Sequence, residues 1–194
     1  GKTKRILEHY FHFRELTFPP FLVVMFLLIG FLVIRYGNDI HLLPINQPIS
    51  LSSSQGQEEI LLNNSFRSKG MLVVSNLTGS LTLPDKTPVA SVIVLGQDQR
   101  FESFNLKAGK DTAEETLERP AVKDKVLHRR AAIYRSWKVA PEADPSFMAH
   151  EYYTKFLFSR PLEVQTITLK FLGVNHEDLP SDMALQIKEI ILLK

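Results

Sequence analysis

The chain has 194 residues, a formal net charge of +2 and no cysteine. The small charge argues against a nucleic-acid partner, which would need a basic surface. The missing cysteines exclude disulfides, zinc–thiolate sites and thiol nucleophiles. A domain of about 150 residues can fold on its hydrophobic core alone, and the missing disulfides favour a bacterial or organellar origin.

A long apolar run is the strongest pattern near the N-terminus. Residues 16–34 read LTFPPFLVVMFLLIGFLVI and contain no charged residue. A helix needs about 20 mostly apolar residues to cross the hydrocarbon core of a membrane, so the run predicts one transmembrane helix at residues 16–36. No small-residue cleavage motif follows, which favours an uncleaved anchor over a signal peptide.

Basic residues on the two sides of this run predict its orientation. Only Arg35 follows it closely, whereas four basic residues precede it: Lys2, Lys4, Arg5 and Arg14. The positive-inside rule places residues 1–15 in the cytoplasm. The expected location is the cell inner membrane, or an equivalent energy-transducing membrane, with the C-terminal domain in the periplasm or an equivalent extracytoplasmic space.

The chain after the apolar run divides into a linker and one domain. Residues 37–57 are rich in Pro and Ser and predict the linker, and residues 58–194 predict the domain. Asn63-Asn64-Ser65 is typical of a turn, and Asn76–Gly79 supplies turn chemistry for a hairpin. The expected strands of this part are Glu59–Leu62, Met71–Ser75, Ser80–Leu83 and Val89–Leu95.

The middle of the chain is less regular. Thr112 and Glu115 have the spacing of a capping box, which predicts a short helix that Pro120 interrupts. For residues 121–139 the periodicity fits a helix and a strand equally well.

The last third predicts strands bounded by Pro, Gly, Asn or Asp: Tyr152–Phe158, Leu162–Phe171 and Leu185–Leu193. Several short strands separated by turn signals favour an antiparallel sandwich. The sequence therefore predicts a single-pass membrane protein. One N-terminal transmembrane α-helix precedes a mainly-β ectodomain, an antiparallel β-sandwich or jelly roll with a short helical insertion.

The strand pair KFLFSRPLEVQTITLKF (residues 155–171) and the terminal strand LQIKEIILLK (residues 185–194) resemble the galactose-binding-like β-sandwich. This jelly-roll scaffold is shared by many carbohydrate-binding modules, and a closing strand of this apolar–polar type commonly completes its sheet. The resemblance covers only the C-terminal part of the chain and implies a fold more than a function.

No pattern predicts catalysis. The chain has no Gly-x-Ser-x-Gly elbow and no Gly-rich phosphate loop, and its histidines do not have the spacing of a known metal motif. We therefore expect no catalytic residue, no bound metal and no cofactor, and thus a protein that is not an enzyme.

Two groups of residues are candidates for ligand binding. Arginine suits carboxylate and phosphate groups, so one basic–aromatic group predicts docking of an anionic partner: His128, Arg129, Arg130, Tyr134, Arg135, Trp137 and Lys138. Trp137 with Tyr152 and Tyr153 predicts stacking on sugar rings. The alternatives are a solvated basic face with Trp137 in the core, and ordinary packing of the tyrosines.

Two functions fit these expectations. The first is a non-enzymatic accessory or scaffolding subunit of a larger membrane protein complex. Its partners would be other membrane subunits, reached through the helix and the ectodomain, and the lipid bilayer. The second is a carbohydrate-recognising ectodomain that serves envelope polysaccharide assembly or export, with a glycan as its partner.

Overall fold

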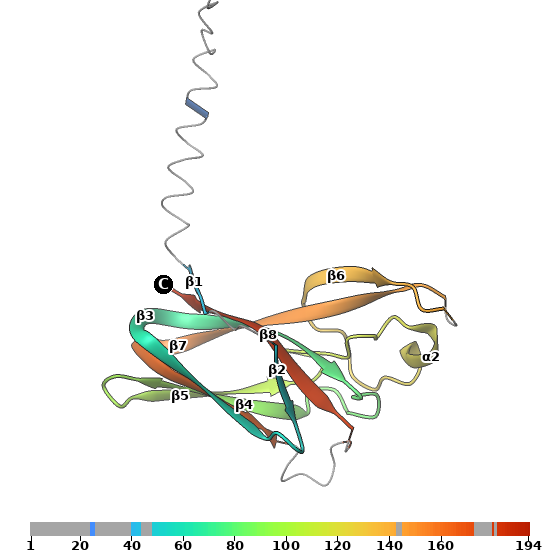
Figure 1. Ribbon diagram of the computed structural model, residues 1–194, viewed down its shortest axis with the longest axis horizontal. Coiled ribbons are helices and arrows are strands. Elements are labelled where there is room, and N and C mark those ends of the chain that lie inside the picture. Colours follow the sequence, from blue (N-terminus) through green and yellow to red (C-terminus); the bar gives the residue numbers. More distant parts are fainter. Residues whose placement is uncertain (1–23, 26–39, 44–47, 143–144, 173–179, 181) are drawn as a thin grey trace, which may run out of the picture. The chain divides into compact units, whose positions relative to one another are not determined.

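The computed structural model describes residues 24–25, 40–43, 48–142, 145–172, 180 and 182–194 (Figure 1). The chain divides into two compact units, Gly1–Asp39 and Ile40–Lys194. In the first unit the described residues are Val24 and Met25, which are helical. The second unit contains every strand of the described chain.

The second unit is built on one eight-stranded sheet whose pairings are all antiparallel. The strand order is β1-β8-β3-β7-β4-β5, and β2 also pairs with β8 and β6 with β7. The elements are β1 (Ile40–Leu42), β2 (Ile49–Ser52), β3 (Gln57–Thr78), β4 (Pro88–Gly96), β5 (Phe101–Lys107), α2 (Pro120–Lys123), β6 (Ile133–Val139), β7 (Phe147–Phe171) and β8 (Ala184–Leu193).

Two very long strands determine the shape of the sheet. β3 has 22 residues and β7 has 25, and they pair along almost their whole length. The register shifts between Leu61 and Phe66 and again between Ser68 and Gly70; such irregularities bend a strand and increase its twist. The sheet therefore curls (Figure 1). One cluster of buried side chains includes residues from both halves of β7 and from the second half of β3, and Ile60 and Phe66 of the first half of β3 pack against it while partly buried.

The bend requires a glycine in β3. A Cβ atom at Gly70 would lie 2.4 Å from the carbonyl oxygen of Phe156 on β7. Beyond this bend, the second half of β3 pairs with β8 as well as with the first half of β7. The first half of β3 pairs with the second half of β7, which also pairs with β4.

The core lies on the concave side of this sheet. Burial of an aliphatic side chain contributes about 1.5–3 kcal/mol, and six members of the core from three strands have no exposed surface: Val92, Val94, Ile167, Leu169, Leu185 and Ile187. Alternating apolar residues in β4 place every second side chain in this core. In β8 the alternation shifts by one residue between Ile187 and Ile190, where the register with β3 also shifts.

The connection between β5 and β6 joins the sheet through its backbone. The Leu77 amide donates to Ala113 O (2.8 Å), and the Glu115 amide donates to Leu77 O (2.8 Å). On the other side, the His150 amide donates to Glu115 O (3.0 Å). Residues 113–115 therefore bridge the end of β3 and the start of β7.

The predicted mainly-β character is confirmed, but the predicted fold class is wrong. In the part of the chain that the structure describes, no helix is long and apolar enough to span a membrane. The expected membrane helix at residues 16–36 lies outside the described residues, except for Val24 and Met25. The expected sandwich of short strands is one curled sheet organised by two long ones.

Three local predictions are also corrected. The expected hairpin around Asn76–Gly79 does not form, because β3 continues to Thr78 and a turn follows. The expected capped helix after Thr112 is absent from residues 111–119, and the four-residue helix α2 instead begins at Pro120, a residue favoured at the first helical position. Within residues 121–139, the structure has a strand at Ile133–Val139.

Candidate functional site

The three arginines predicted to bind an anion each contact a different carboxylate. Arg129 Nη2 lies 2.9 Å from Asp85 Oδ2, and Arg130 Nη1 lies 2.9 Å from Glu118 Oε1. Arg135 Nε lies 2.5 Å from Glu151 Oε2. Hydrogen bonds from Arg129 lower the pKa of Asp85. The guanidinium groups thus point to three separate partners and do not converge on one ligand.

Tyr134 occupies a register shift in β6 and reaches across the sheet. Its hydroxyl donates to Glu189 Oε2 on β8 (3.0 Å), and this bond raises the pKa of Tyr134. Its ring meets that of Tyr153 on β7 edge-on, with 6.5 Å between the ring centroids. Val74 pairs with both Tyr153 and Glu189 and has no exposed surface. We infer that the Tyr134 side chain crosses above Val74.

These residues lie on a partly solvent-exposed surface that we call the outer face. It consists of the side chains that point away from the core on β7, β3 and β8, together with the Tyr134 side chain of β6, which contacts Tyr153 and Glu189. The strand registers align three rows on it. The members are Tyr153, Lys155 and Leu157 on β7, Leu72 and Val74 on β3, and Glu189, Ile191 and Leu193 on β8. Large apolar or aromatic groups remain exposed there: Leu157 at 61%, Tyr134 at 41% and Tyr153 at 39%.

Trp137 on β6 lies on the same side of the sheet as the outer face, but away from Tyr153 along β7. Trp137 pairs with Ala149, which lies four residues before Tyr153 on β7, so about 13 Å of strand separates the two positions. The ion pair between Arg135 and Glu151 occupies the interval, because Arg135 pairs with Glu151. Tyr152 is fully buried instead and packs with Ala113 and Ala131, so it does not contribute to this surface.

Sequence reasoning missed a buried polar cluster formed by Ser80, Glu114 and His128. Ser80 Oγ lies 2.8 Å from Glu114 Oε2 and 3.1 Å from His128 Nε2. The residue types are those of a nucleophilic triad, but there the carboxylate contacts the imidazole rather than the serine. Because Ser80 has no exposed surface, this cluster presents no nucleophile to a substrate. It joins three distant segments of chain.

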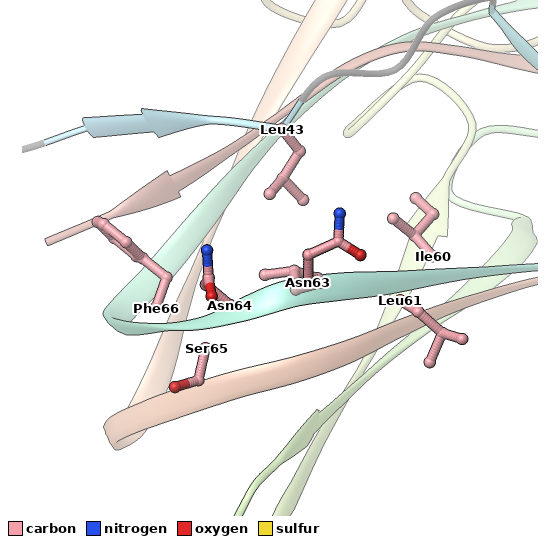
Figure 2. Close-up of a pocket in the computed structure, with 8 residues that line it drawn as sticks. Leu43, Ile60, Leu61, Asn63, Asn64, Ser65 and Phe66 are labelled. Carbon is pink, nitrogen blue, oxygen red and sulfur yellow. The ribbon is translucent and has the colours of Figure 1, made fainter.

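A hollow of ≈ 300 Å³ lies at the register shift in β3. Figure 2 shows Leu43, Ile60 and Asn63 converging on it, whereas Leu61 and Ser65 point to the other side of the strand. Leu61 is 71% exposed. The predicted turn at Asn63-Asn64-Ser65 is thus an irregular stretch within β3.

Among the described residues, no group of three His, Asp or Glu side chains is arranged to hold a metal ion. Comparisons with protein-family models, curated proteins and solved structures find no match to this chain. The resemblance to the galactose-binding-like sandwich therefore stays a prediction.

Proposed function

We propose that this chain is a non-enzymatic scaffolding subunit of a larger protein assembly, and that its outer face binds a protein partner. The observation that supports the proposal is the group of exposed apolar and aromatic side chains Tyr134, Tyr153 and Leu157 on one sheet face. Tyrosine is enriched at the centres of protein interfaces, where its ring is buried and its hydroxyl keeps a polar partner.

The arrangement of Tyr134 prepares this surface for binding. Its hydroxyl is already bonded to Glu189, and its ring is supported by Tyr153. A partner that covers these rings would therefore immobilise little additional side-chain freedom, which lowers the cost of binding. Lys155 and Glu189 provide one charge of each sign for polar contacts around the apolar residues.

Native purification of the full chain tests this proposal. We expect the wild-type protein to elute within a larger assembly of fixed stoichiometry, and the double variant Tyr134→Ser/Tyr153→Ser to elute without it. Leu127→Ser is the matched control, because Leu127 is 63% exposed and lies outside the outer face. A wild-type protein that elutes alone, or a double variant that keeps its partners, would contradict the proposal.

Carbohydrate recognition is the second candidate. The observation in its favour is the placement of Trp137 and Tyr153 on one face with the polar pair Arg135 and Glu151 between them. Aromatic rings offer apolar faces for stacking, and the pair offers hydrogen-bonding groups between them. A glycan array with the wild-type protein tests this reading. If binding persists in Trp137→Ala/Tyr153→Ala, the glycan site is not here.

A further inference from the structure

β5 lies at one end of the spatial strand order, and one of its edges is not paired with any other described strand (Figure 1). β5 pairs with β4 in an unbroken register from Leu95↔Phe101 to Ala90↔Leu106. Natural proteins usually protect such an edge with a proline, a lysine, a bulge or a covering segment. The stretch FESFNL from Phe101 to Leu106 contains no proline, no lysine and no register shift. Its one charged residue, Glu102, accepts a hydrogen bond from the Ser159 amide on β7.

The hairpin before β5 shows which backbone groups face this edge. The Gly96 amide donates to Arg100 O (2.8 Å), which makes this a hydrogen-bonded pair. Hydrogen-bonded and non-hydrogen-bonded pairs alternate along an antiparallel ladder. Phe101, Ser103 and Asn105 therefore form non-hydrogen-bonded pairs with β4, and their N–H and C=O groups point away from it.

The end of the strand supports this assignment. Lys107 continues the same alternation, and its outward groups are bonded to the following loop: its amide donates to Asp111 Oδ2 (3.0 Å) and its carbonyl accepts from the Asp111 amide (2.9 Å). None of the described residues bonds the outward groups of Phe101, Ser103 or Asn105. The edge thus offers a ladder of three residues that ends at Lys107.

A hollow with charged residues in its lining lies at the opposite end of β5. It has a volume of ≈ 300 Å³, and its lining includes two basic residues, Arg100 and Arg160, and one carboxylate, Glu102, which accepts a hydrogen bond from the Ser159 amide (2.9 Å). Arg100 is paired with Asp98 (2.5 Å). Arg160 is exposed, and no carboxylate of the described residues lies within ion-pair distance of it.

We propose that the edge of β5 binds the extended C-terminal tail of a partner protein as an additional antiparallel strand, and that Arg160 binds its terminal carboxylate. Added strands obtain their affinity from such main-chain hydrogen bonds. An antiparallel strand on β5 runs from Asn105 toward Phe101, so its C-terminal end arrives at the hollow. A guanidinium group matches the geometry of a carboxylate.

The test uses the full chain and a library of ten-residue peptides with free C-termini, from which binders are selected and synthesised. We expect Ser103→Pro to weaken binding of the selected peptides about tenfold, because proline removes an outward amide and leaves the bonds to β4 intact. Asn105→Thr is the control, since it keeps the backbone amide. Hydrogen exchange should slow at the amides of Phe101, Ser103 and Asn105 when peptide is added.

Arg160 is tested separately. Amidation of the peptide C-terminus should weaken binding to the wild-type protein. In Arg160→Gln, the peptide with a free C-terminal carboxylate and the amidated peptide should bind with the same affinity. Arg67→Gln, which changes an exposed arginine on β3, should preserve the difference between the two peptides. The proposal fails if no peptide is selected, if the selected peptides bind Ser103→Pro unchanged, or if acid and amide bind equally. Protection of the same amides that grows with protein concentration, without peptide, would show that a second copy occupies the edge instead.

Discussion

The buried carboxylate of Glu114 predicts a large loss of stability on its removal. It accepts hydrogen bonds from the Ser80 amide (3.0 Å), the Ser80 hydroxyl (2.8 Å) and the Thr116 hydroxyl (3.1 Å), and only 4% of the residue is exposed. A hydrogen bond to a charged group contributes about 1.5–3 kcal/mol, and such contributions do not add fully. We therefore expect Glu114→Ala to lower the free energy of unfolding by about 3 kcal/mol.

Urea denaturation followed by circular dichroism measures this loss. Glu114→Gln should cost about half as much, because an amide oxygen can still accept from Ser80. The loss expected for Glu114→Ala, about 3 kcal/mol, corresponds to a melting temperature lower by about 6–12 °C for a domain of this length. Glu59→Ala, at an exposed position of β3, should change the free energy by less than about 0.5 kcal/mol. If Glu114→Ala lowered the free energy of unfolding no more than Glu59→Ala does, the cluster of Ser80, Glu114 and His128 would not anchor the β5–β6 connection.

Three further predictions address other parts of the fold. Burial, opposed in part by Lys188, raises the pKa of Glu115 above 4.5. The protonated Glu115 side chain therefore contributes its full stability below the unfolded-state pKa, and this contribution is lost as the pH rises through the folded-state pKa. The melting temperature of Glu115→Gln should accordingly rise relative to that of the wild type across this pH range, and a constant difference would contradict the assignment. Gly70→Ala should destabilise the protein by about 1–3 kcal/mol in urea denaturation, because the added methyl group meets the Phe156 carbonyl; an unchanged midpoint would show that the bend relaxes. Leu169→Ala, at a position without exposed surface, should cost about 2–5 kcal/mol in the same assay, and a cost below about 1 kcal/mol would place Leu169 outside the core.

Local patterns predicted most strand-forming segments but not how they join, and the expected strand Ser80–Leu83 is a turn. The β-branched residues of Val89–Leu95 and the turn signals that bound Leu185–Leu193 are local signals, and both segments are strands. The polar stretch Asn63-Asn64-Ser65 is typical of a turn, yet it lies within β3 because β7 pairs with the chain before and after it. The capping box at Thr112 failed for the same reason, since residues 113–115 bond to Leu77 and His150 instead.

The candidate binding residues were found only in part. A basic–aromatic stretch shows in the sequence, and Tyr134 and Tyr153 do meet on one surface. The carboxylate partners of the arginines come from distant segments, as in the pairing of Arg129 with Asp85, and no local pattern predicts them. The open edge of β5 is likewise a property of strand order, which depends on long-range pairing.

The two proposed surfaces lie on different parts of one sheet, and this separation makes a scaffolding role testable as a whole. The outer face belongs to the half in which β3 pairs with β8, whereas β5 pairs only with β4. If the two sites bind different partners, Tyr134→Ser/Tyr153→Ser should release one partner and leave peptide binding at β5 unchanged. Ser103→Pro should have the opposite effect. Loss of both activities in either variant would mean that the variant disturbs the shared β3–β7 pair, and would remove the case for two independent sites.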